Sequence, residues 1–113
     1  MNITEKEAFE ISRIYDEILE ERDRQNMKHP KPCKLFLDKR LSEKDMTAYS
    51  NSLKAENKIS EKDGEENWID TIVEEVFEAG AEKSWKERRK ELIEAAATIV
   101  RCIQVNDKAN PRR

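Results

Sequence analysis

Apolar residues recur at helical spacing along the first quarter of the chain. The pattern predicts a helix that begins at the capping box Thr4-x-x-Glu7 and ends before His29-Pro30. Its apolar positions follow the first of them, Ile11, at distances of three, four, seven and eight residues, which places them on one helix face. They are Ile11, Ile14, Tyr15, Ile18 and Leu19.

Three further helices follow from the same kind of signal. The second is expected from about Ser42 to Asn57, with Ser42-x-x-Asp45 as its cap, and the third begins near Trp68 after the polar segment 60–67. A second capping box, Ser84-x-x-Glu87, marks the start of the fourth. The connector 27–40 carries a short apolar patch of Leu35, Phe36 and Leu37, which we expect to pack on the core.

The third and fourth predicted helices are apolar over most of their circumference. On each helix one stripe is fully apolar, and a second stripe is uncharged apart from its glutamates. A helix of this kind packs on more than one side. The apolar stripes are Ile72, Val73, Val76, Phe77 and Gly80 on the third helix and Leu92, Ile93, Ala96, Ile99, Val100 and Ile103 on the fourth. The second stripes are Thr71, Glu75, Glu78, Ala79 and Glu82, and Glu91, Glu94, Ala95, Thr98, Cys102 and Val105.

Two carboxylate pairs lie on these second stripes. Glu75 and Glu78 form one pair, and Glu91 and Glu94 form the other. Residues three apart share a helix face, so two facing stripes would bring four or five negative charges together. A hard divalent cation such as Mg²⁺ relieves that repulsion, because it prefers clustered oxygen ligands. The alternative is a solvated charged surface, since 42% of the residues are Asp, Glu, Lys or Arg.

Length and composition predict one all-α domain over residues 1–113, an antiparallel bundle of about four helices. The chain has no apolar run long enough for a membrane span and no signal peptide at its N-terminus, so we expect a cytoplasmic protein. A net charge of −3 with interspersed signs argues against a nucleic-acid or membrane surface as the partner. Cys33 and Cys102 are expected to be reduced thiols.

Two blocks of the sequence resemble the MazG-like nucleotide pyrophosphohydrolases, in particular the short phage-type members. The first block is ILEERDRQNMKH, and the second is WIDTIVEEVFEAGAE followed by RRKELIEAAATIVRCIQ. The resemblance implies an all-α MazG-like fold and a Mg²⁺ ion, with Mn²⁺ as a substitute. It also implies hydrolysis of a nucleoside triphosphate between its α and β phosphates, which yields the monophosphate and pyrophosphate.

Carried over residue by residue, the resemblance assigns the metal site and its chemistry to the two pairs. Glu75, Glu78 and Glu91 match the family pattern, whereas Glu94 stands where typical members have Asp. The longer Glu94 side chain therefore binds the metal directly, binds it through water, or serves as the base on the attacking water.

Arg22, Gln25 and Lys28 are the candidate substrate-binding residues. They continue the stripe of the first helix, so they are expected to point inward and to approach the nucleotide or support the carboxylates. The alternative is that Arg22 pairs with a nearby Glu while Gln25 and Lys28 finish the helix end. Lys86, Arg88 and Arg89 are further phosphate candidates, with a solvated basic cluster as the default interpretation.

Two departures from the family pattern keep three function classes open. His29-Pro30 replaces the usual Trp-Gly, and Phe77 occupies a position often held by Gly. The leading class is the Mg²⁺-dependent pyrophosphohydrolase. The alternatives are a nucleotide-binding or regulatory relative with weak or no turnover, and a structural helical assembly module. In all three we expect a homo-oligomer, a dimer or tetramer, that completes the bundle.

Overall fold

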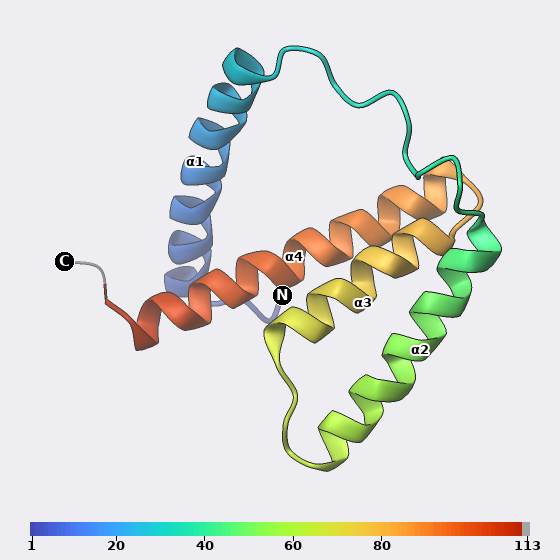
Figure 1. The fold of residues 1–113 in the computed structure, drawn as a ribbon. Coiled ribbons are helices and arrows are strands. Elements are labelled where there is room, and N and C mark those ends of the chain that lie inside the picture. The colour runs from blue at the N-terminus through green and yellow to red at the C-terminus, as the bar shows by residue number, and fades with distance from the viewer. Residues whose placement is uncertain (112–113) are drawn as a thin grey trace. The chain divides into compact units, whose positions relative to one another are not determined.

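The computed structural model describes residues 1–111 and contains four α-helices and no strand within that range (Figure 1). The predicted all-α class is therefore confirmed. Helix α1 spans Glu5–Lys28, α2 spans Glu43–Lys62, α3 spans Trp68–Ala81 and α4 spans Trp85–Ala109. No helix of the described chain has both the length and the apolar composition needed to cross a membrane.

Side-chain caps start the helices where the sequence predicts them. The hydroxyl of Thr4 accepts the backbone N–H of Glu7 at the start of α1, at 3.1 Å. Ser42 and Asp45 form a complete capping box at the start of α2. Before α4, the hydroxyl of Ser84 accepts the N–H of Glu87 at 3.2 Å. Each cap satisfies a backbone donor that a helix N-terminus otherwise leaves without a partner.

The predicted C-terminal boundary of α2 was wrong. The helix continues five residues beyond Asn57, so the polar turn is limited to residues 63–67. Its end is a Schellman motif, in which Glu65 N–H donates to the Ser60 carbonyl at 2.7 Å and Gly64 N–H to the Glu61 carbonyl at 3.2 Å. Gly64 has a φ of 73°, a conformation that favours glycine. Gly64 is thus the sequence signal that marks the true end of α2.

The described chain forms two compact units. Unit 1 comprises Met1–Lys34 and the residues from Val100 onwards, so it contains α1 and the C-terminal part of α4. Unit 2 comprises Leu35–Ile99 and contains α2, α3 and the first part of α4. One domain over residues 1–113 stays a prediction, and residues 112 and 113 lie outside the described range.

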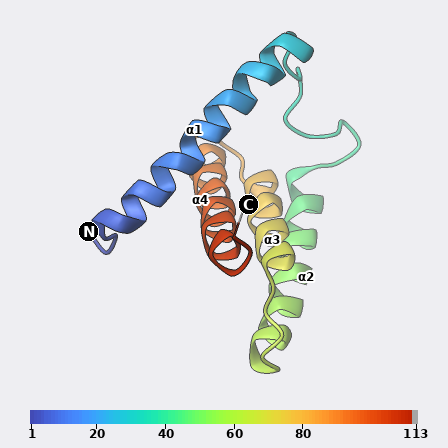
Figure 2. The ribbon, with the colours of Figure 1, turned by 90° about the vertical axis from the view of Figure 1, so that its left-hand side faces the viewer.

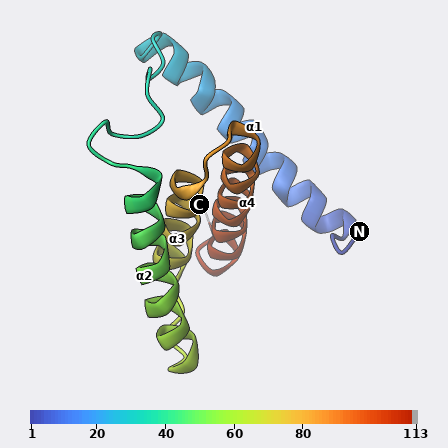
Figure 3. The same cartoon turned by 90° about the vertical axis from the view of Figure 1, so that its right-hand side faces the viewer.

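In unit 2, α3 lies between α2 and the first part of α4 (Figures 2 and 3). Small buried residues allow α2 and α3 to approach closely. Ala79 and Gly80 of α3 are buried, and a Cβ on Gly80 would overlap the Met46 methyl group of α2. The same Cβ would lie 3.4 Å from Leu37, so the predicted packing of the connector patch on the core is confirmed for this residue. The position of Gly80 thus requires a residue without a side chain, unless Met46 moves.

The packed residues of α4 coincide only in part with the apolar stripe expected to be its main core face, since Val100 of that stripe is buried and other members are exposed. Ala95, on the carboxylate stripe, is only 3% exposed, whereas Ile93 and Ile99 on the apolar stripe are 55% and 39% exposed. On α3, Val76 of the expected core stripe is likewise exposed. The carboxylate-bearing stripes therefore face each other, and part of the apolar stripes remains open to solvent in this chain.

Candidate metal centre

Three of the four predicted carboxylates converge in unit 2. Glu78 of α3 and Glu91 and Glu94 of α4 each offer an oxygen atom, and these oxygens lie within 4.8 Å of one another. Glu78 and Glu91 are half-buried and Glu94 is exposed, so the cluster sits at the edge of the core with one side open to solvent. Carboxylate oxygens grouped in this way are the ligand type that hard divalent cations prefer.

Glu75, the fourth carboxylate, has a hydrogen-bond partner of its own. Thr98 of α4 directs its hydroxyl at the Glu75 carboxylate, with Oγ1 2.8 Å from Oε1 and 3.0 Å from Oε2. The Thr98 oxygen also lies 3.1 Å from the backbone carbonyl of Glu94. Glu75 is thus held next to the triad without belonging to the group of three.

The triad is electrostatically strained. One Glu91 oxygen, Oε2, is buried without a hydrogen-bond partner. The pKa of Glu91 is raised to about 7, chiefly by burial and in addition by the neighbouring carboxylates of Glu78 and Glu94. Burial also raises the pKa of Glu75, although the hydrogen bond from Thr98 opposes that effect. The protein therefore holds negative charge here at a cost in free energy.

A lysine from α2 lies beside the triad. The Nζ atom of Lys54 is 3.7 Å from Oε1 of Glu78, and both side chains are partly exposed. The ammonium group offsets part of the negative charge on the side of Glu78. Neither Lys54 nor Thr98 was identified from the sequence. Thr98 lies on the same helix stripe as Glu94, which is a usable signal, whereas nothing in the α2 pattern separates Lys54 from the other lysines of that helix.

The three candidate substrate residues lie on α1, in unit 1. Arg22 donates to the Gln25 side-chain oxygen at 3.1 Å and to that of Asn26 at 3.0 Å. Arg22, Gln25 and Lys28 are all exposed, which differs from the expected inward orientation. The last turns of α1 are mostly polar on all sides, so no apolar face directs these side chains inward. The hydrogen bonds of Arg22 stay within α1. Their role in substrate binding stays a prediction.

Arg88 is part of the structural framework of unit 2. Its Nε donates to the Glu82 carbonyl at 2.8 Å, its Nη2 lies 3.2 Å from Oε1 of Glu43, and its guanidinium is 4.7 Å from the centre of the Phe36 ring. Phe36 also makes an edge contact with Trp85, at 6.4 Å between ring centres. These contacts join the connector, α2 and the start of α4. Arg88 was considered as a phosphate ligand from the sequence, and the structure gives it three other partners.

Comparison of this chain with protein families, with curated proteins and with solved structures finds no significant match.

Proposed function

We propose that this protein is a Mg²⁺-dependent nucleoside triphosphate pyrophosphohydrolase of the MazG-like type. The observation that carries the proposal is the convergence of Glu78, Glu91 and Glu94 from two helices to within 4.8 Å. The sequence resemblance assigns these same residues to a metal site. The motif and the geometry of the three carboxylates both support this proposal.

The donor set fits a hard divalent cation. All three groups are carboxylates, and the buried oxygen of Glu91 has no hydrogen-bond partner that would compete with a cation. The open side at the exposed Glu94 leaves room for water and phosphate oxygens. When bound, Mg²⁺ or Mn²⁺ would neutralise the triphosphate and lower the pKa of a coordinated water molecule.

The residues of the chain divide the remaining tasks. Glu78, Glu91 and Glu94 would hold the cation. Glu75, which accepts a hydrogen bond from Thr98 beside the triad, would accept a proton from the attacking water, a task suited to a carboxylate outside the metal ligands. Arg22, Gln25 and Lys28 are proposed to bind the triphosphate, and the products would be the nucleoside monophosphate and pyrophosphate.

We also propose that the protein acts in the cytoplasm as a homo-oligomer, a dimer or tetramer. In unit 2, α3 and α4 expose apolar side chains that a second copy of the chain would cover. Ile69 and Val76 of α3 are 69% and 47% exposed, and Ile93 of α4 is 55% exposed. The same exposed surface supports the structural assembly module as the second candidate function, while the Glu94 and His29 departures leave room for a nucleotide-binding relative with little turnover.

Pyrophosphate release tests the proposal. The purified protein is incubated with a panel of ribo- and deoxyribonucleoside triphosphates in Mg²⁺ or Mn²⁺, and Glu78→Gln is compared with Glu56→Gln, an exposed carboxylate of α2 outside the cluster. We expect metal-dependent release that Glu78→Gln abolishes and Glu56→Gln preserves. Nucleotide binding without release would favour the regulatory relative. A melting temperature that responds to neither metal nor nucleotide would leave only the assembly module.

A further inference from the structure

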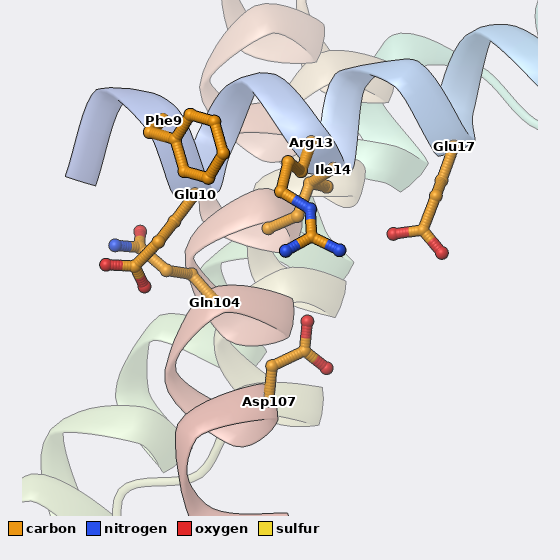
Figure 4. A pocket seen from close by; sticks show the side chains of 7 residues that line it. All are labelled: Phe9, Glu10, Arg13, Ile14, Glu17, Gln104 and Asp107. Atoms are coloured by element: carbon orange, nitrogen blue, oxygen red, sulfur yellow. The ribbon is translucent and has the colours of Figure 1, made fainter. Parts of the chain in front are cut away.

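A cavity of about 330 Å³ lies entirely within unit 1, between α1 and the C-terminal part of α4. Phe9, Glu10, Arg13, Ile14 and Glu17 line it from α1, and Gln104 and Asp107 face them from α4 (Figure 4). Its volume is at the lower end of the range of about 300–1,000 Å³ that is usual for small-molecule sites. None of the residues in the proposed metal centre contributes to it.

The polar groups of this cavity are incompletely satisfied. Gln104 is only 9% exposed, and its side chain borders the cavity. Glu10 pairs through Oε2 with Lys108, at 3.5 Å, but its Oε1 atom is buried and has no hydrogen-bond partner. Buried polar groups are normally paired, so the Glu10 oxygen left open at the cavity indicates a ligand.

Arg13 and Asp107 carry opposite charges, and both line this cavity. Among residues 1–111, the Arg13 guanidinium and the Asp107 carboxylate have no ion pair within 4.0 Å, although both border the cavity. A metal ion does not suit this arrangement, because the only metal-type carboxylate cluster in the described chain is Glu78, Glu91 and Glu94. A ligand with one positive and one negative group would satisfy both sides.

We propose that this cavity binds a zwitterionic small molecule of the amino-acid class. Its ammonium group would be held by Glu10 and Asp107, its carboxylate by Arg13, and the Gln104 amide would hydrogen-bond either group. Ile14, which is buried, and Phe9 provide apolar surface for the body of the ligand. This binding site is independent of the proposed hydrolase activity.

Ligand binding is tested by NMR titration of the full chain with each of the standard L-amino acids, following the side-chain amide of Gln104. The best ligand is then compared with its two single-charge analogues, the amine that lacks the carboxylate and the acid that lacks the amino group. We expect saturable shifts for the amino acid and at least tenfold weaker binding of both analogues. Equal binding of either analogue would overturn the proposal. So would the absence of binding by every amino acid at about 10 mM, a concentration above the dissociation constant of even a weak specific site.

Variants locate the site. Arg13→Met and Glu10→Gln should each weaken binding about tenfold, which corresponds to one lost charged contact. Their matched controls are Lys6→Met and Glu20→Gln, exposed α1 residues that do not line the cavity, and these should bind as the wild type does. Because Glu10→Gln also removes the partner of Lys108, the analogue comparison on the wild-type chain decides the proposal even if this variant unfolds. Binding that survives Arg13→Met unchanged would refute the assignment.

Discussion

The hydroxyl of Thr98 on α4 is 2.8 Å from the Glu75 carboxylate on α3. The bond crosses between the two helices that carry the acidic triad, one helical turn beyond Glu94. It gives Glu75 a donor of its own, so the four glutamates predicted as one set divide into a triad and a separately held neighbour. This division separates the proposed cation ligands from the proposed base.

Thr98→Val should raise the pKa of Glu75 above its wild-type value, because the hydrogen bond that favours the ionised carboxylate is lost. The free energy of unfolding should fall by about 1 kcal/mol at pH 8 and by less at acidic pH, where Glu75 is protonated. Carboxyl-carbon NMR titration and chemical denaturation measure the two effects. Thr98→Ser, which keeps the hydroxyl, is the control, and an unchanged Glu75 titration in Thr98→Val would contradict the role of this bond.

Without added metal, the protein should lose stability as the pH rises from about 4.5 to about 7. The pKa of Glu91 is raised from 4.5 to about 7 in the folded protein, chiefly by burial, so the folded state binds the proton more tightly than the unfolded state does. The stabilisation from this proton is complete below the unfolded pKa and is lost as the pH passes the folded pKa.

Glu91→Gln should flatten this part of the stability profile, because the amide does not titrate. Denaturation midpoints in a chelating buffer between pH 4 and 8 provide the measurement, with Glu56→Gln as the control that retains the wild-type slope. A slope of the same size in Glu91→Gln would assign the pH dependence to other groups.

Lys54→Gln should tighten the binding of Mn²⁺ to the nucleotide-free protein several-fold. The ammonium group 3.7 Å from Glu78 repels a cation at the proposed metal centre, and solvent screening limits the effect to about 1 kcal/mol. Calorimetric titration measures the affinity. Lys58→Gln, one turn further along α2 and outside the ion pair, is the matched control and should bind Mn²⁺ like the wild type. Equal affinities in all three proteins would remove Lys54 from the site.

Arg88→Lys should destabilise the fold by about 1–2 kcal/mol, since lysine cannot make the forked contacts or stack on Phe36 as a planar guanidinium does. Arg89→Lys, at the exposed neighbouring position, should change stability by less than about 0.5 kcal/mol. Urea denaturation of the two variants gives the comparison. If the two substitutions cost the same, the framework role of Arg88 is wrong.

Local patterns predicted the helices well, because the decisive contacts are close in sequence. The caps at Thr4, Ser42 and Ser84 each join residues three apart, so the residue types alone identify them. The predicted end of α2 was too early, because residues 58–62 are compatible with both a helix and a polar turn, whereas the positive φ of Gly64 marks the actual C-terminus.

The sequence by itself determined the all-α class, most helix ends and the two carboxylate pairs on stripes of α3 and α4. Only the tertiary structure decided that Thr98 binds Glu75, that Lys54 lies beside Glu78, and that Ile93 stays exposed while Ala95 is buried. The physical reason is that helical periodicity places residues on a face, whereas the rotation of each helix against its neighbours decides which face meets which. That rotation depends on packing contacts between distant residues, such as Gly80 against Met46, and a local pattern does not contain them.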